Sequence, residues 1–101
     1  MNKQIANEIL RQLGGNKFIA MTGARNFYAT ENGIGFKVSA TMTRNRINFV
    51  KVTLNALDTY DVEFVAIRGT KIKTVAVLDG IYNDQLAEVF EAQTGLRTRL
   101  F

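Results

Sequence analysis

The chain has 101 residues, of which 47% are hydrophobic and 22% charged, a composition that suits one soluble globular domain. It contains no His, Cys, Trp or Pro. These absences exclude disulfide scaffolds, thiolate nucleophiles, zinc sites with nitrogen or sulfur ligands, and histidine acid–base catalysis. No apolar run approaches the roughly 20 residues of a membrane span, and the first ten residues lack a signal-peptide stretch. The sequence therefore predicts no membrane association and a cytoplasmic location.

The net charge of +4 is spread unevenly along the chain. Residues 1–57 hold eight basic and two acidic side chains, whereas residues 58–91 hold three basic and seven acidic ones. A basic first half can attract a polyanion or an acidic protein surface. A solvated surface whose oppositely charged halves attract each other after folding explains the same distribution. The sequence leaves both interpretations open.

The first predicted element is a helix over residues 2–13. Ile5, Ile9 and Leu13 recur every four residues and form one apolar stripe. Asn2 can cap its start, and Gly14-Gly15 ends it, since glycine adopts the left-handed stop conformation without strain. An isolated helix of this length is marginal in water, so the stripe is expected to pack on a sheet.

Five strands are predicted between residues 17 and 78, where apolar or alternating segments are separated by turn residues. They are Lys17–Thr22, Ile34–Ala40, Asn48–Leu54, Val62–Arg68 and Lys71–Leu78. The connections are short enough for hairpins, so the strands are expected to pair as an antiparallel meander.

A second helix is predicted from Asn83 to about Thr94, with Asn83 or Asp84 as its cap and Gly95 at its end. The tail after it is expected to add an edge strand or to insert its last two residues, Leu100 and Phe101, into the core. The predicted fold is α+β, a single domain over residues 1–101 in the order α-β-β-β-β-β-α. Its antiparallel meander sheet packs against N- and C-terminal helices.

The residues that remain for catalysis are carboxylates, hydroxyls, lysines and tyrosines. Asp58, Asp61 and Glu63 cluster, and paired carboxylates can bind Mg²⁺ or share acid–base duties. A charged strand edge that discourages aggregation also explains them, and in the absence of a family signature we favour this interpretation. No serine has a base available, and the glycines do not form a phosphate-binding loop, because Gly14-Gly15 closes a helix. We therefore predict that the protein is not an enzyme and needs no metal or cofactor.

The segment Gly14–Phe27 (GGNKFIAMTGARNF) resembles a phrase found in small uncharacterised proteins of bacteriophages, prophages and other mobile elements. The likeness continues at Val50–Asn55 and Asp58–Phe64 and through residues 82–96, so it spans most of the chain. It implies a mobile-element protein in the cytoplasm of a bacterial host. The resemblance implies no established activity and carries over no catalytic residue.

A binding surface is the remaining possibility, because aromatic and basic side chains share the strand faces opposite the core pattern. Aromatic rings stack on bases and Lys or Arg follow the phosphates in proteins that bind single-stranded nucleic acid. The candidate residues are Arg25, Tyr28, Lys37, Arg44, Arg46, Phe49 and Lys51. Lys71 and Lys73 are expected on the same face, on a neighbouring strand. Alternatively, Phe49 lies under a helix and the lysines are solvated edges.

A protein partner is the alternative to nucleic acid. In that hypothesis the chain is an interaction module that binds and inhibits a host complex, such as a defence or nucleic-acid-handling complex. A homodimer through edge strands or through an exposed sheet face is also predicted. Polyanion binding weakens steeply with salt and an apolar protein interface does not, so ionic strength separates these hypotheses.

Overall fold

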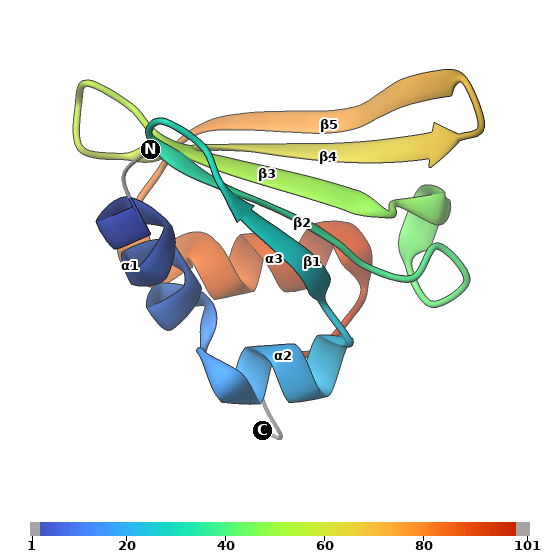
Figure 1. The fold of residues 1–101 in the computed structure, drawn as a ribbon, viewed down its shortest axis with the longest axis horizontal. Helices are drawn as coiled ribbons and strands as arrows, with labels where there is room; N and C mark the ends of the chain where they lie inside the picture. The colour runs from blue at the N-terminus through green and yellow to red at the C-terminus, as the bar shows by residue number, and fades with distance from the viewer. Residues whose placement is uncertain (1–2, 99–101) are drawn as a thin grey trace.

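The computed structural model describes residues 3–98 and shows a five-stranded sheet with helices on one side (Figure 1). The helices are α1 (Lys3–Leu13), α2 (Asn16–Thr22) and α3 (Leu86–Thr94), and the short 3₁₀ turns are η1 (Arg44–Arg46) and η2 (Asn83–Gln85). The strands are β1 (Arg25–Ala29), β2 (Gly33–Lys37), β3 (Phe49–Leu54), β4 (Tyr60–Arg68) and β5 (Lys71–Ile81). They pair antiparallel in chain order, which confirms the predicted α+β meander.

The prediction of a strand at Lys17–Thr22 is wrong, because this segment forms α2. Its two buried residues, Phe18 and Thr22, are four apart and so lie on one helix face. The Thr22 hydroxyl donates to the Phe18 carbonyl at 2.7 Å, and Gly23 ends the helix in the left-handed conformation. The periodicity of so short an apolar run does not distinguish a helix from a buried strand.

The strand that replaces it in the sheet is β1, which the sequence pattern did not reveal. Arg25 pairs with Lys37 and Tyr28 with Gly35, and an irregularity lies between these two pairs. Asn26 adopts a positive φ of 56° within it. This bulge interrupts the strict alternation by which strands are identified in a sequence.

The core lies between the helices and one face of the sheet (Figure 1). Phe18 of α2 packs edge-on against Phe36 of β2 and Phe90 of α3, with ring centroids 5.5 and 5.0 Å apart. These rings and Phe64 are at most 2% exposed. The opposite face of the sheet has no helix over it in the described part of the chain. We call this the open face.

A bulge in β5 decides which side chains reach each face. Phe64 pairs with Ala76, but its neighbour Val65 pairs with Thr74, so Val75 is an extra residue in β5. Because one extra residue reverses the alternation, Lys71 and Lys73 lie on the helix side of the sheet. The expectation that these two lysines share a face with Phe49 is therefore wrong.

The predicted C-terminal helix is confirmed, but its predicted cap is wrong. Asn83 and Asp84 lie within the 3₁₀ turn η2, whose N-cap is Tyr82, and α3 starts after Gln85. The turn η2 leads into α3, and Gly95 ends it in the left-handed conformation with its N–H bonded to the Glu91 carbonyl at 2.9 Å. Leu96 is buried, as expected for the apolar residue after such a cap. The predicted roles of Asn2, Leu100 and Phe101 lie outside the described residues. No helix within residues 3–98 has the length and apolar composition needed to cross a lipid bilayer.

Candidate nucleic-acid interface

Two aromatic rings from different strands lie together on the open face. Tyr28 of β1 and Phe49 of β3 are nearly parallel, with centroids 6.1 Å apart and 18° between their planes. They meet across β2 because Gly35, between them, has no side chain, and the Tyr28 ring occupies the space that a Cβ would take. We call this pair the aromatic platform.

The platform is accessible from solvent. Tyr28 is 47% exposed, and Phe49 is partly exposed and does not belong to the core cluster. Phe49 pairs directly with Val65, which is buried but also lies outside that cluster. The hypothesis that Phe49 lies under a helix is therefore wrong, because its side chain projects from the uncovered side of the sheet.

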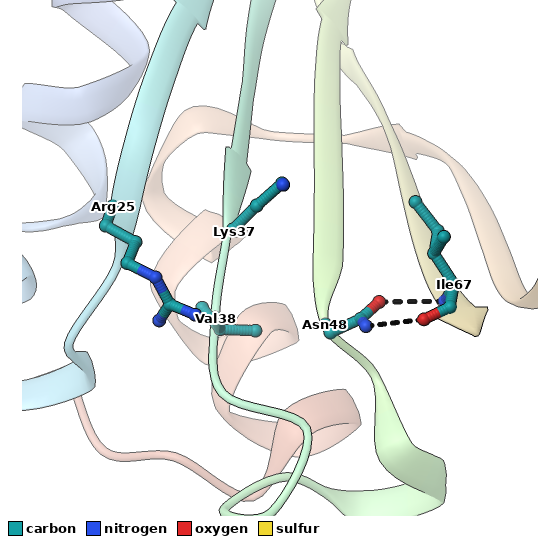
Figure 2. Close-up of a pocket in the computed structure, with 5 residues that line it drawn as sticks. All are labelled: Arg25, Lys37, Val38, Asn48 and Ile67. Atoms are coloured by element: carbon teal, nitrogen blue, oxygen red, sulfur yellow. Dashed lines mark hydrogen bonds between the residues drawn. The ribbon is translucent and has the colours of Figure 1, made fainter. Parts of the chain in front are cut away.

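Two basic residues stand beside the platform at the end of the sheet where β1 begins. Arg25 pairs with Lys37, and Lys37 pairs with Phe49 on its other side. Both basic side chains are exposed and line a hollow of about 240 Å³ together with Val38, Asn48 and Ile67 (Figure 2). Two positive charges therefore lie close to the aromatic platform, Arg25 on the same strand as Tyr28 and Lys37 on the strand between Tyr28 and Phe49.

Asn48 forms one wall of this hollow and holds it in shape. Its amide nitrogen donates to the Ile67 carbonyl and its carbonyl oxygen accepts from the Ile67 N–H, both at 2.8 Å (Figure 2). The side chain thereby extends the pairing between β3 and β4 by one residue before Phe49, the first residue of β3. The sequence analysis placed Asn48 at the start of a strand but assigned its side chain no role, because a hydrogen bond to a distant backbone leaves no local signal in the sequence.

Lys51 lies on the open face but in a different electrostatic setting. It pairs with Gly35 on one side and with Glu63 on the other. It also lines a hollow of about 300 Å³ whose walls include Asp61, Glu63 and Asp79. The nearby carboxylates weaken the attraction of Lys51 for an anion.

The two loop arginines lie elsewhere. Arg44 turns toward α3, where its guanidinium donates to the Ala92 carbonyl at 3.3 Å and packs beside Gly95. Arg46 faces the start of β5 and lines hollows with Lys73. The structure therefore brings together Arg25, Tyr28, Lys37, Phe49 and Lys51 of the predicted site residues, and separates Arg44 and Arg46 from them.

Charge is polarised along the strands. One end of the sheet, where β1, β3 and β5 begin and β2 and β4 end, carries basic residues. They are Arg25, Lys37, Arg46, Arg68 and Lys71. The opposite end carries the acidic residues Glu31, Asp58, Asp61 and Asp79. The single ion pair within residues 3–98 joins Arg11 to Glu8 on α1, so the basic end is not neutralised internally.

The carboxylates proposed for metal binding have ordinary structural surroundings. One Asp61 oxygen accepts from the Asn55 side chain at 3.0 Å and from the Gly80 N–H at 3.3 Å. The Asn55 side chain in turn organises the β3–β4 turn through the Thr59 hydroxyl at 2.8 Å. Within residues 3–98 no group of three or more acidic residues is arranged to hold a metal ion.

Comparisons with protein-family models, with curated proteins and with solved structures found no match to this chain. The resemblance of Gly14–Phe27 to small mobile-element proteins therefore stays a prediction.

Proposed function

We propose that this protein is a non-enzymatic binder of single-stranded nucleic acid and that the open face of its sheet is the binding surface. The observation that carries the proposal is the aromatic platform of Tyr28 and Phe49, exposed beside the basic pair Arg25 and Lys37. Every base has a π-face, so such rings bind unpaired bases with little sequence preference.

The arrangement favours single strands over duplexes. Bases in a duplex are stacked on each other and cannot lie on protein rings, whereas bases in a single strand are free to do so. With a base on the platform, the adjoining phosphates fall near Arg25 and Lys37, one or two strands away. In keeping with the resemblance to phage and prophage proteins, we place this activity in the cytoplasm of a bacterial host.

Fluorescence anisotropy with labelled 20-nucleotide oligo(dT) and oligo(rU) tests the proposal. We expect binding that weakens as salt rises, and a loss of affinity in Tyr28→Ala. Tyr82→Ala is the matched control, because Tyr82 is also exposed (61%) but precedes α3 and lies off the platform. Absence of binding to both oligonucleotides at low salt, or equal losses in the two variants, contradicts the proposal.

A protein partner is the second candidate, favoured by exposed aliphatic side chains on β5. Ile72 is 72% and Val77 58% exposed, and both lie on the open face of an edge strand of 11 residues. An unpaired edge with apolar side chains is suited to pairing with a host protein or with a second copy of this chain.

Two measurements separate this candidate from nucleic acid. A pull-down from bacterial lysate, with and without nuclease, retains a direct protein partner in both samples and loses one bridged by nucleic acid. Light scattering after size exclusion, at several concentrations, measures homodimer formation. Val77→Lys disrupts an apolar interface but leaves the aromatic platform intact. If this variant no longer binds the partner or forms the dimer, the β5 surface is the interface.

A further inference from the structure

A second basic surface lies on the helix side of the sheet, at the end of the β4–β5 hairpin. A hollow of about 280 Å³ is lined there by Asn45, Arg46, Ala66, Arg68, Lys71 and Lys73. An adjoining hollow of about 450 Å³ shares Asn45, Arg46 and Lys73 and adds Val75. We call the two together the hairpin hollow. Its lining residues come from η1, β4 and β5, and the register of β4 with β5 places Ala66, Lys71 and Lys73 on the face of the sheet opposite the aromatic platform.

The strand register forces like charges together at this hollow. Arg68 pairs directly with Lys71, and Lys73, two residues along, pairs with Ala66. Like charges directly opposite each other on antiparallel strands destabilise the sheet. The small side chain of Ala66 leaves the floor of the hollow open between the basic groups.

No ion pair within residues 3–98 compensates these charges. None of the residues that line the hairpin hollow is acidic, and Arg46, Arg68, Lys71 and Lys73 are all exposed. Within residues 3–98 none of the four takes part in an ion pair. The repulsion is therefore left unrelieved by the described part of the protein itself.

The backbone beside the hollow is also unusual. Asn45 and Arg46 are consecutive residues with positive φ values of 55° and 57°. This conformation is unfavourable for a residue with a long side chain, and such strain concentrates at ligand-binding sites. Here both residues line the same hollows as Lys73 of the hairpin.

We propose that the hairpin hollow is a phosphate-binding site. A phosphate group is compact, carries up to two negative charges and accepts several hydrogen bonds, and Arg and Lys are its usual ligands. Bound in the hollow, it would replace the repulsion between Arg68 and Lys71 by attraction to both. The inference does not depend on the proposed function, because the site lies on the other face of the sheet from Tyr28.

An NMR titration of the ¹⁵N-labelled protein with inorganic phosphate tests the site directly. We expect saturable shifts at the amides of residues 45–46 and 66–73. Lys71→Gln/Lys73→Gln should weaken the affinity at least about tenfold, since two charge-assisted contacts are lost. Lys3→Gln/Lys17→Gln, which removes the same net charge from the helices, should leave it nearly unchanged. Absent or non-saturable shifts, or equal losses in both double variants, overturn the proposal.

Ala66→Leu tests the hollow without changing any charge. The larger side chain fills the floor between the basic residues, so phosphate affinity should again fall at least about tenfold. Ala20→Leu on the exposed side of α2 is the control for adding the same apolar volume. Unchanged phosphate affinity in a folded Ala66→Leu protein contradicts binding within the hollow and indicates diffuse attraction to the basic end of the sheet.

Oligonucleotides with and without a 5′-phosphate identify the source of the phosphate group. If only the phosphorylated form loses affinity in Lys71→Gln/Lys73→Gln, the hollow binds strand ends. If both forms lose it equally, the hollow binds internal phosphates. If neither form does while inorganic phosphate still binds in the hollow, the ligand is a free phosphate or a small phosphomonoester. The oligonucleotide result for Tyr28→Ala is measured separately, so failure of one site does not obscure the other.

Discussion

The ring of Tyr28 fills the space above Gly35 in which any side chain at position 35 would lie. The two residues pair across β1 and β2, and the missing side chain allows the ring to extend over β2 toward Phe49 of β3. The aromatic platform therefore depends on a glycine that adds no side chain to it. A substitution at Gly35 therefore tests the platform without changing either of its rings.

Gly35→Ala should displace Tyr28 while leaving the fold intact. The three atoms nearest to a Cβ at this position all belong to the outer end of the exposed Tyr28 ring, which can move, and alanine suits a strand better than glycine. We expect unfolding free energy within about 1 kcal/mol of the wild type. Oligonucleotide affinity should fall as in Tyr28→Ala, and adding Gly35→Ala to Tyr28→Ala should have no further effect. Additive losses would mean that Gly35 acts independently of the ring.

Gly33→Ala should instead damage the fold. A Cβ at Gly33 collides with the Val52 carbonyl oxygen and with the Thr53 Cα on the neighbouring strand, and backbone atoms within a sheet cannot move aside as a side chain can. We expect a loss of about 3 kcal/mol in urea unfolding. A loss below about 1 kcal/mol would show that β2 and β3 separate easily at this end.

Phe49→Ala distinguishes stacking from core packing. Phe49 is partly exposed, so its removal should cost about 1–2 kcal/mol of stability, less than the roughly 3–5 kcal/mol expected for fully buried Phe36→Ala. Affinity for single strands should fall roughly 5- to 150-fold, the range for loss of one stacked base. Unfolding curves and anisotropy on the same samples separate the two effects. If the folded fraction of Phe49→Ala binds with normal affinity, Phe49 does not stack on a base.

Arg25→Gln/Lys37→Gln should flatten the salt dependence of binding. Each lost contact between a basic group and a single-strand phosphate lowers the slope of log K against log salt by about 0.7, so the double variant should lose about 1.4. Arg44→Gln is the control, since the Arg44 guanidinium donates to the Ala92 carbonyl on α3. The slope of log K against log salt for this variant should equal that of the wild type. Equal slopes in all three proteins would remove Arg25 and Lys37 from the interface.

Glu8 should make α1 sensitive to acid. Hydrogen bonds from Arg11 and then Gln12 to its carboxylate lower the pKa of Glu8 below the ordinary 4.5. A lowered pKa in the folded state contributes stability that is present above pH 4.5 and disappears as the pH falls through the lowered value. The stability difference between the wild type and Glu8→Ala, measured by thermal unfolding, should therefore shrink below pH 4.5. A constant difference down to pH 2 would contradict this role for the carboxylate.

Much of the fold could be predicted from local patterns. The stripe of Ile5, Ile9 and Leu13 and the stop at Gly95 are properties of neighbouring residues, and the structure confirms both helices. Four of the five predicted strands are present, although their ends are shifted. They could be predicted because the alternation of apolar and polar residues is also a local pattern. The uneven charge was visible in the sequence as well, although its separation onto opposite ends of the sheet was not.

The other features were decided by the tertiary structure, because they depend on packing between distant residues and on the register between strands. The apolar run Lys17–Thr22 forms a helix because Phe18 packs against Phe36 and Phe90, residues far away in the chain. One extra residue, Val75, turns Lys71 and Lys73 to the helix side of the sheet. The platform likewise requires Gly35 to stand opposite Tyr28. Alternation within a strand determines which residues share a face, whereas the pairing between strands determines which of those residues meet.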